Sequence, residues 1–450
     1  MMYKKRLLLL TAAAALLSSA VSCSDAKKGK DSAVSGSVNT DDVTTAEPEP
    51  DNMEITWVAD YDLNPQKGGE RSTALALFED VYGGKINYVK TNPDEKYGTL
   101  DYLIMTGSQV DMFPYDDASF PDGIIREQFE ALDPYFDIMG MDEGIWDDMK
   151  DVIDSFAYKG QHYVIPYDIS DPFILTYSRK LMQSEGLEDP YKLYTEGKWT
   201  WDTFREMMEK FTGTQTGASR YGIGGWFGRA LLASTGHTVI GFDGSSFTNN
   251  ISDPEIEKAE NFMKDIASKQ LYRNDWLSCF PSDHSTLFYG MGEWSLGDST
   301  KYDPEGDIMA VPFPKAPDAD RYYISCGYKA KMLAKYSPKG RAVAAYIKCE
   351  RLAASEEKFR AARKPANVTD EQYAMLCELR DPAKAVPVFD WGYGMGERMN
   401  SNGDYNFDSR GVMNNIDTVL LTGEGPVGSW AELRDKLKGT IDSELKKYTE

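Results

Sequence analysis

The sequence has few residues of the kinds that bind metals or act as nucleophiles. It contains three histidines among 450 residues, His162, His237 and His284, and they form no HxxxH or HExxH pair. No G-x-S-x-G sequence is present, and the five cysteines form no CxxC motif. We therefore expect no metal, no other cofactor and no Ser-His-Asp triad.

Basic residues are also scarce. Lys and Arg number 49 against 72 Asp and Glu, which gives a net charge of −23, and no basic cluster of the sort that neutralises phosphates is present. We therefore expect no nucleic-acid partner. Hydrophobic residues make up 41%, aromatic residues 12% and charged residues 27%, a balance typical of a globular protein rather than a disordered chain, collagen or a multi-span membrane protein.

The N-terminus has the features of an export signal. Lys4, Lys5 and Arg6 precede an apolar stretch from Leu7 to Leu17, which is shorter than the ~20 residues of a membrane span. Ala20-Val21-Ser22-Cys23 then resembles a bacterial lipobox, with Ala20 where Leu is usual. We expect 1–22 to be a lipoprotein signal peptide and Cys23 to carry the lipid. The alternative is ordinary cleavage after Ser22, with Cys23 left as a free thiol.

A linker follows the lipobox, and 23–53 is expected to be a lipid anchor and flexible tether. Ser24 to Asn52 contains no aromatic residue and no Leu, Ile or Met, so it cannot bury enough surface to fold. These features predict an exported protein, lipid-anchored to the outer face of the bacterial cell membrane. Four cysteines remain beyond the anchor and either pair in one of three ways or stay unpaired: Cys279, Cys326, Cys349 and Cys377.

From Met53 onward, short apolar strands alternate with helices. The pattern predicts strands over 54–59, 85–90 and 110–113, with helices over 71–82 and after Asn92. Alternation of this kind favours βαβ units in a parallel, helix-covered sheet, where ligands meet the loops beyond the carboxyl ends of the strands. Those loops contain Asp60, Tyr61 and Asp62, and then Tyr115, Asp116 and Asp117.

Later segments predict further strands and capped helices. A strand is expected over 173–177, a helix over 179–185, and a helix from the N-cap Thr200 through Phe211. Capping boxes are predicted at Ser252 and at Ser429 with Glu432. The last helix carries an apolar stripe that must pack on a core: Trp430, Leu433, Leu437, Ile441 and Leu445.

Several stretches together resemble one family. They are 111–136 (DMFPYDDASFPDGIIREQFEALDPYF), 163–180 (YVIPYDISDPFILTYSRK), the Glu188-Asp189-Pro190 and 197–202 (GKWTWD) segments, 288–294 (FYGMGEW) and 308–315 (IMAVPFPK). The Trp-Thr-Trp-Asp motif is fairly specific, and the order of the stretches matches along nearly all of the chain after Met53. The sequence is similar to extracellular solute-binding proteins, family one, the maltodextrin-binding-like receptors of ABC sugar importers.

The resemblance implies an α/β, two-lobe periplasmic-binding-protein-like (flytrap) fold with crossover strands. The first lobe is expected over 54–169 and 328–369, and the second over 170–327 and 370–450. The implied function is capture of a carbohydrate, expected to be an oligosaccharide, in an interlobe cleft and its delivery to the permease subunits of an ABC importer. The resemblance implies no chemistry of the protein's own, and we expect a monomer.

Sugars present ring faces and hydroxyl-rich edges, so their sites need aromatic planes together with carboxylates or amides. By position, the resemblance places the hydroxyl acceptors at Asp60, Tyr61, Asp116 and Asp117 beside Tyr115, with Asp171 on the crossover. It places the remaining ligand-binding residues at Trp226, Phe227, Trp294, Trp391, Tyr393, Phe407 and Asp408. Three further tryptophans, Trp57, Trp199 and Trp201, are expected in the core instead.

Other interpretations remain open. Acidic, aromatic clefts also serve two-carboxylate catalysis, so a secreted glycoside hydrolase is the main alternative. The same fold could bind a peptide, polyamine, phosphate ester or iron, although few His and matched Arg residues are expected in the site. Oxygen ligands alternate from Asp404 to Asp408 as at the start of a calcium loop, but Ser409 replaces the required Gly and Asn415 the closing Glu.

Overall fold

A computed structural model describes residues 52–213, 219–359, 363–401 and 407–448. The predicted signal peptide, the lipidation site Cys23, nearly all of the tether and the calcium-like sequence at Asp404 lie outside the described residues. In the described part of the chain, no helix is long and apolar enough to cross a bilayer. The four described cysteines are unpaired, and Cys326 and Cys349 are buried.

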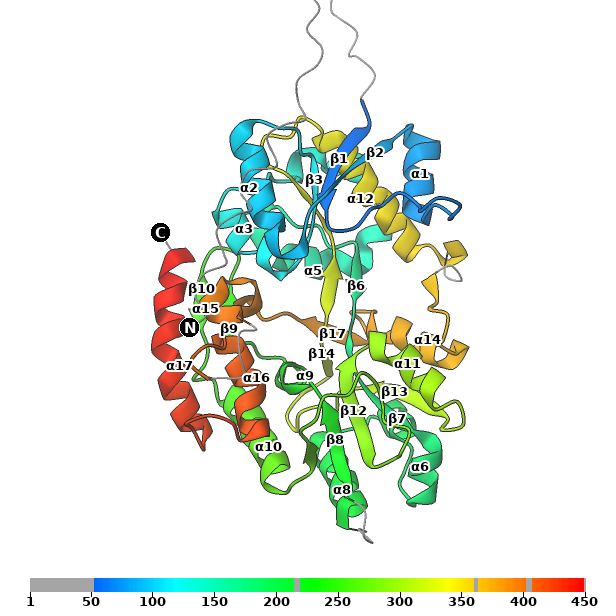
Figure 1. Cartoon of the computed structure of the whole chain (residues 1–450), viewed down its shortest axis with the longest axis vertical. Coiled ribbons are helices and arrows are strands. Elements are labelled where there is room, and N and C mark those ends of the chain that lie inside the picture. The colour runs from blue at the N-terminus through cyan, green and yellow to red at the C-terminus, as the bar shows by residue number, and fades with distance from the viewer. Residues whose placement is uncertain (1–51, 214–218, 360–362, 402–406, 449–450) are drawn as a thin grey trace, which may run out of the picture. The chain divides into compact units, whose positions relative to one another are not determined.

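The first sheet contains four strands in the order β16-β3-β1-β2 (Figure 1). Their bounds are Glu54–Ala59 for β1, Lys85–Lys90 for β2, Met112–Pro114 for β3 and Lys331–Leu333 for β16. Strands β1, β2 and β3 are parallel, whereas β16 runs antiparallel to β3. The apolar run of β1 is buried, as expected for a strand covered on both faces.

Helices α1 (Thr73–Tyr82), α2 (Lys96–Thr106) and α12 (Gly340–Ser355) pack around this sheet. Helix α1 begins where the Ser72 hydroxyl accepts the Leu75 N–H at 3.2 Å, and it ends at Gly83, whose φ of 63° is readily adopted by glycine. Helix α12 packs against α1 and β1 although more than 250 residues separate it from them. The first lobe is therefore built from two distant parts of the chain.

Between β3 and the first crossover, the chain forms short elements. These are α3 (Asp122–Ile125), α4 (Phe136–Met139), α5 (Lys150–Ser155) and the paired strands β4 (Ala157–Tyr158) and β5 (Gln161–His162).

The second sheet has the strand order β11-β8-β12-β7-β13. Its strands are β7 (Phe173–Ser178), β8 (Tyr221–Gly225), β11 (Tyr272–Arg273), β12 (Thr286–Gly292) and β13 (Ile308–Pro312). Strand β7 runs opposite to its neighbours β12 and β13. The parallel sheet expected for the first segment is confirmed for β1, β2 and β3 but wrong for β16, which enters that sheet from a crossover and runs against the others.

The helices of the second lobe lie around this sheet and at the C-terminal end of the chain. They are α6 (Arg179–Ser184), α7 (Pro190–Thr195), α8 (Trp201–Gly213), α9 (Gly228–Ala233), α10 (Pro254–Ser268), α11 (Trp294–Tyr302), α14 (Asp370–Leu379), α15 (Glu397–Asn400), α16 (Val412–Thr422) and α17 (Trp430–Leu445). All five apolar residues of the predicted α17 stripe are buried, which confirms that prediction.

Two capping predictions need correction. Helix α10 is capped by Asp253, whose carboxylate accepts the Glu255 N–H at 2.8 Å, and not by Ser252. Ser429 caps α17 as predicted, but the Glu432 carboxylate accepts from Gly428 N–H at 2.7 Å rather than from the cap residue itself.

Paired strands connect the two lobes and confirm the two-lobe fold with crossover strands. Strand β6 (Asp168–Ser170) leads into β7 and pairs antiparallel with β15 (Gly327–Lys329), which leads back to β16. Strands β14 (Tyr322–Ser325) and β17 (Ala385–Val388) form a parallel pair.

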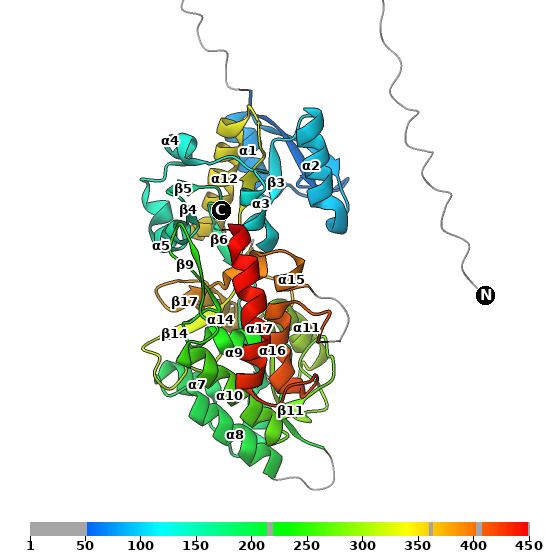
Figure 2. The same ribbon diagram turned by 90° about the vertical axis from the view of Figure 1, so that its left-hand side faces the viewer.

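A hairpin of the second lobe also reaches the first. Strands β9 (Ile240–Phe242) and β10 (Phe247–Asn249) form this hairpin, which lies beside β4 and β5 (Figure 2). The Lys159 N–H donates to the Gly244 carbonyl at 2.7 Å across this contact.

Candidate ligand-binding site

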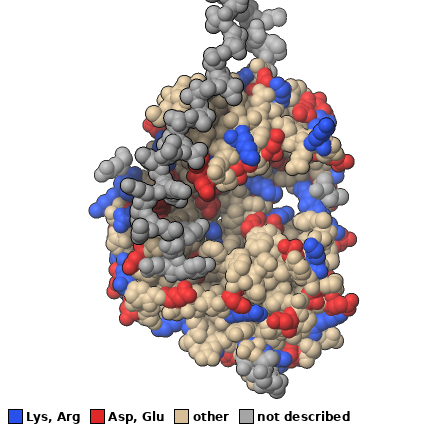
Figure 3. Space-filling view, viewed as in Figure 1, with Lys and Arg blue, Asp and Glu red and all other residues tan. Residues whose placement is uncertain are grey.

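A cavity of about 390 Å³ lies where the end of β3 meets the crossover strands and the C-terminal part of the second lobe. It is lined by Tyr115, Asp116, Asp117, Ala118, Ser170, Gly327, Tyr328, Tyr393 and Asn400. Figure 3 shows that this side of the molecule is hollowed between the two lobes, with acidic and basic side chains around the hollow. Four of the predicted site residues thus lie together: Tyr115, Asp116, Asp117 and Tyr393.

The first lobe contributes the loop that follows β3. The Asp116 carboxylate accepts the Ala118 N–H at 3.1 Å and so starts a short 3-10 helix, and it also contacts Lys96 and the Tyr97 hydroxyl. Asp117 is the next residue, and burial raises the pKa of its carboxyl while Arg229 opposes the shift. The Tyr115 hydroxyl is buried and has no hydrogen-bond partner among the described residues.

The second lobe contributes Tyr393 from the 3-10 helix Trp391–Gly394. Asp390 fixes this segment because its carboxylate accepts the Gly392 N–H at 3.0 Å and the Ile240 N–H at 3.2 Å. The Tyr393 hydroxyl donates to the Asp417 carboxylate of α16 at 2.6 Å. Burial raises the pKa of Asp390 to about 6 and that of Asp417 to about 7, so both carboxyl groups titrate near neutral pH.

Arg229 is a charged residue beside the candidate site that sequence reasoning missed. It lies on α9, and its guanidinium lies 4.0 Å from the centroid of the Tyr393 ring and 5.5 Å from that of Phe173. Arg380 forms an ion pair with Glu293, whose charge also acts on Asp171. The sequence led us to expect few matched Arg residues in the site, and it did not indicate that Arg229 lies beside it. The sequence feature that could have indicated Arg229 is a single charged residue within the otherwise apolar segment GRALLA.

Asp171 lies at the turn from β6 into β7, with a left-handed φ of 44° that is uncommon outside glycine. Its carboxylate lies against Gly292, where a Cβ would come within 2.6 Å of Oδ1. Burial, with a smaller contribution from Glu293, raises the pKa of Asp171 to about 6, although the backbone N–H groups of Trp294 and Glu293 oppose the shift. Asp171 Oδ1 is buried without a hydrogen-bond partner among the described residues.

Two exposed tryptophans follow neighbouring parallel strands of the second sheet. Trp226 comes directly after β8 and Trp294 two residues after β12, and these strands pair at Gly225 and Gly290. The two side chains are 41% and 50% exposed, which is unusual for tryptophan in a folded core. They lie at the strand ends where α/β sheets bind ligands.

Two other predicted aromatic residues are covered by protein. Phe227 is 1% exposed and packs against Tyr272 and Phe313. Trp391 is 6% exposed and packs at ring-centroid distances of 4.9 to 5.4 Å in an aromatic cluster that joins elements of both lobes: Phe120, Phe156, Phe242, Phe389 and Trp391. Neither residue lines the cavity, because its ring is already packed against other rings.

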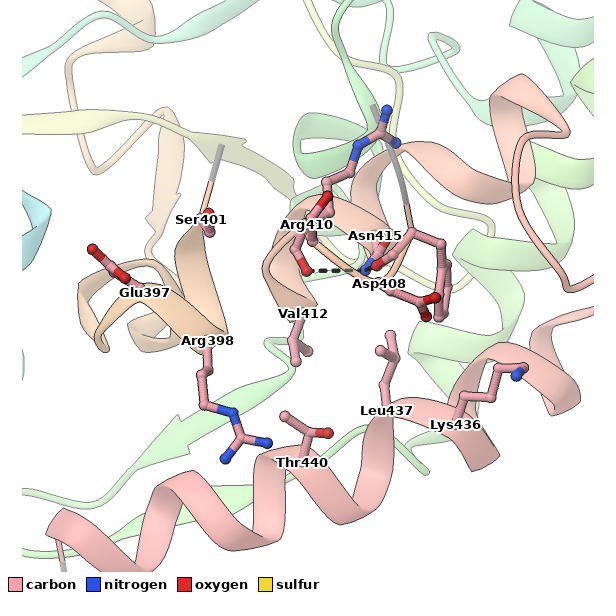
Figure 4. A pocket seen from close by; sticks show the side chains of 12 residues that line it. Glu397, Arg398, Ser401, Asp408, Arg410, Val412, Asn415, Lys436, Leu437 and Thr440 are labelled. Carbon is pink, nitrogen blue, oxygen red and sulfur yellow. Dashed lines mark hydrogen bonds between the residues drawn. The ribbon is translucent and has the colours of Figure 1, made fainter. Parts of the chain in front are cut away.

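The remaining predicted residues line other cavities or surfaces. Phe407 and Asp408 line a separate cavity of about 470 Å³ among α15, α16 and α17 (Figure 4). Asp60 follows β1 and lines a third cavity with Thr91 and Asn92. The Tyr61 hydroxyl lies 3.4 Å from the Lys331 ammonium.

Among the described residues, no group of three or more His, Cys, Asp or Glu side chains is arranged to hold a metal ion. Two α/β lobes, crossover strands and a cavity lined by rings and carboxylates define a solute receptor of the flytrap class. The family model for bacterial extracellular solute-binding proteins matches residues 73–358, and the chain belongs to this family. The resemblance seen in the sequence is confirmed, and membership implies export.

Solved structures of this class are similar in fold. A cyclic α-maltosyl-1,6-maltose binding protein from Arthrobacter globiformis is 16% identical with a TM-score of 0.62, over 87% of this chain and 99% of that one. The sugar-binding protein MalE from Xanthomonas citri is 15% identical with a TM-score of 0.62, over 88% and 98%. UgpB from Mycobacterium tuberculosis, in complex with glycerophosphocholine, is 17% identical with a TM-score of 0.58, over 87% and 99%. No curated protein sequence matches the chain.

Proposed function

We propose that this protein is the carbohydrate receptor of an ABC importer. The observation that carries the proposal is the cavity into which both lobes and a crossover direct tyrosine rings and carboxylates. Rings stack on sugar faces, and carboxylates accept from hydroxyls. The similar folds from Arthrobacter globiformis and Xanthomonas citri are described as binding sugars, which supports the same ligand class here.

The proposed binding site has a first-lobe side, a second-lobe side and a crossover. Asp116, Asp117 and Tyr115 form the first side, Tyr393, Trp226 and Trp294 the second, and Asp171 lies on the crossover. A cavity of about 390 Å³ is near the lower end of the ~300–1,000 Å³ typical of ligand pockets. We therefore propose a short oligosaccharide or a single sugar as ligand.

Further proposals, on membrane anchoring, oligomeric state and lobe boundaries, follow from the sequence. Cys23 would carry a lipid that holds the receptor at the outer face of the membrane, where it would act as a monomer that docks on the permease subunits. The first lobe would comprise 54–169 and 328–369, and the second 170–327 and 370–450. The membership of the strands in two sheets supports these boundaries.

A phosphate ester is the second candidate ligand, because Arg229 lies beside the cavity and UgpB is described in complex with glycerophosphocholine. Guanidinium groups bind phosphates well. Against it stand two carboxylates in the same region that have no ion pair among the described residues, Asp117 and Asp171, which repel an anion.

The experiment is a thermal-shift screen of the purified full-length protein against single sugars, short oligosaccharides, glycerol 3-phosphate and spermidine. A ligand at 100 times its dissociation constant adds about 2.7 kcal/mol to the free energy of unfolding. The sugars that stabilise the protein are then incubated with it at length. We expect stoichiometric binding without release of product; hydrolysis would instead support a glycoside hydrolase.

A further inference from the structure

Several buried polar atoms near the cavity have no hydrogen-bond partner among the described residues, and three of them belong to a lining residue or to a neighbour of one: Tyr115 lines the cavity, Arg229 lies on the lining residue Tyr393, and Asp171 follows the lining residue Ser170. These three atoms are Nε of Arg229, Oδ1 of Asp171 and the hydroxyl oxygen of Tyr115. Buried polar groups in folded proteins are nearly always hydrogen-bonded, and leaving one unpaired costs free energy. Such groups beside a cavity indicate what the cavity binds.

The guanidinium of Arg229 is held in place without being neutralised. The Tyr393 and Phe173 rings lie on it, and none of the described residues forms a hydrogen bond or a close ion pair with it. Tyr393, in turn, is fixed by its hydrogen bond to Asp417. The arginine is therefore oriented by packing, and its N–H groups remain available.

The three unpartnered atoms differ in chemistry. Arginine only donates, a carboxylate only accepts, and a tyrosine hydroxyl does both. A ligand that satisfies all three must itself both donate and accept. Hydroxyl groups do this at every position, whereas a phosphate or carboxylate only accepts and an ammonium only donates.

The charges around Arg229 favour a neutral ligand. Asp117, Asp390 and Asp417 all act on the guanidinium, and Asp171 lies within range as well. At pH 7.5, above the pKa of about 6 of Asp171 and Asp390 and of about 7 of Asp417, these ionised carboxylates outnumber the Arg229 guanidinium, so an added anion is repelled. A cationic ligand would in turn meet an arginine that has no counter-ion in close contact.

We propose that Arg229 binds the ligand directly, donating its free N–H groups to hydroxyl oxygens of an uncharged sugar whose own hydroxyls donate to Asp171. Arg229 then selects neutral sugars over uronates, phosphate esters and polyamines. This inference rests on the proposed carbohydrate function. It adds that Arg229 contacts the sugar and that the sugar is uncharged.

The test compares two arginines that both lie on aromatic rings. Arg220 lies over the Phe211 ring at 4.5 Å but forms two hydrogen bonds with Glu185, at 2.8 and 2.9 Å, away from the cavity. Full-length wild type, Arg229→Met, Arg229→Lys and Arg220→Met are titrated calorimetrically with the best neutral sugar from a screen. That screen contains glucose, galactose, maltose, cellobiose and lactose, with glucuronate, glycerol 3-phosphate and spermidine as charged probes.

We expect wild type to bind a neutral sugar and none of the charged probes. Arg229→Met should weaken sugar binding about 10- to 100-fold, as expected for loss of hydrogen bonds from a charged donor. Arg229→Lys should recover part of the affinity, and Arg220→Met should lower the melting temperature while leaving the dissociation constant unchanged. Circular dichroism of each variant verifies that it is folded.

The results separate a failure of the role of Arg229 from a failure of the proposed carbohydrate function. If wild type binds a neutral sugar and Arg229→Met binds it equally well, the role of Arg229 is overturned while the carbohydrate function stands. Preference for glucuronate, glycerol 3-phosphate or spermidine overturns the selectivity. If no sugar stabilises the wild type, the proposed function fails, and this inference fails with it.

Discussion

The hydroxyl of Tyr393 donates to the carboxylate of Asp417 at 2.6 Å, a bond that fixes one wall of the cavity to the core of the second lobe. Tyr115 faces the same cavity, yet its hydroxyl is unpartnered among the described residues. One tyrosine hydroxyl is therefore bound within the protein, and the other is buried without a protein partner in the described part of the chain.

This difference predicts that the same Tyr→Phe substitution lowers stability at Tyr393 and lowers sugar affinity at Tyr115. Tyr393→Phe leaves a buried acceptor unpaired and should lower the free energy of unfolding by about 1–3 kcal/mol. Tyr115→Phe should leave stability nearly unchanged and weaken sugar binding instead. Thermal melts and calorimetric titration of both variants measure this. Equal stability losses would show that the Tyr115 hydroxyl has a structural partner.

The exposed Trp294 and the buried Trp199 offer a second pair. Under the proposal that the exposed Trp294 ring stacks on the sugar, Trp294→Ala should cost ~1–3 kcal/mol of sugar-binding energy and should change the melting temperature little. Trp199 is fully buried and its indole N–H donates to the Pro312 carbonyl at 2.9 Å. Trp199→Ala should therefore cost ~3–5 kcal/mol of stability. A large stability loss in Trp294→Ala with unchanged affinity would make Trp294 a packing residue.

Sugar affinity should depend on pH through Asp171. Its pKa is raised to about 6, so the carboxyl is mostly ionised at pH 7.5 and mostly protonated at pH 5. Because the ionised form is the better acceptor, the dissociation constant for the sugar should rise about tenfold when the pH is lowered from 7.5 to 5. Calorimetry at both pH values checks this against Asp171→Asn, which should bind weakly and without pH dependence. A pH dependence that persists in Asp171→Asn would assign the titration to another group.

The stability of the ligand-free protein should change with pH in the opposite direction to sugar affinity. Burial raises the pKa of Asp417 to about 7 and that of Asp390 to about 6, and it raises the pKa of Glu260 on α10 well above its usual range. The folded state therefore keeps protons that the unfolded state releases, so these groups destabilise the fold as pH rises through about 4 to 7.

The melting temperature should accordingly increase as the pH is lowered from 8 to 5, and Asp417→Asn should flatten this slope. An exposed carboxylate such as Asp62 serves as the control, since Asp62→Asn should leave the slope intact. A slope identical in wild type and Asp417→Asn would contradict the assignment.

Membrane attachment is tested at Cys23. Cys23→Ser should abolish incorporation of a labelled fatty acid and release the receptor from the membrane fraction, whereas Cys279→Ser should retain the label. Sugar binding by the released Cys23→Ser protein should match that of the wild type. Labelled protein in the Cys23→Ser strain would place the lipid elsewhere.

The sequence predicted those features that depend on local pattern. The apolar run of β1 and the stripe of α17 required burial, and both are buried. Trp57, Trp199 and Trp201 were expected in the core and are 3% exposed or less, which confirms that prediction.

Features that depend on long-range packing could not be predicted. Trp391 was expected at the ligand, but its position depends on rings from three other segments and from the nearby Phe389, which close around it. Arg229 was missed because nothing next to it in the sequence shows that Tyr393, 164 residues later, lies on its guanidinium. Local sequence restricts which residues are exposed, whereas the chemistry of the site depends on how distant segments meet.

The wall of the cavity has a mechanical consequence. Ser170, Gly327 and Tyr328 belong both to the paired crossover strands and to the surface that a solute would contact. A change in the twist of this two-stranded ribbon moves the cavity wall that the ribbon forms. A molecule bound against that wall therefore restrains the twist directly, and no other side chains need to transmit the effect. Because each lobe extends away from the ribbon as a lever arm, a small displacement at the bound solute becomes a large one at the outer ends of both lobes.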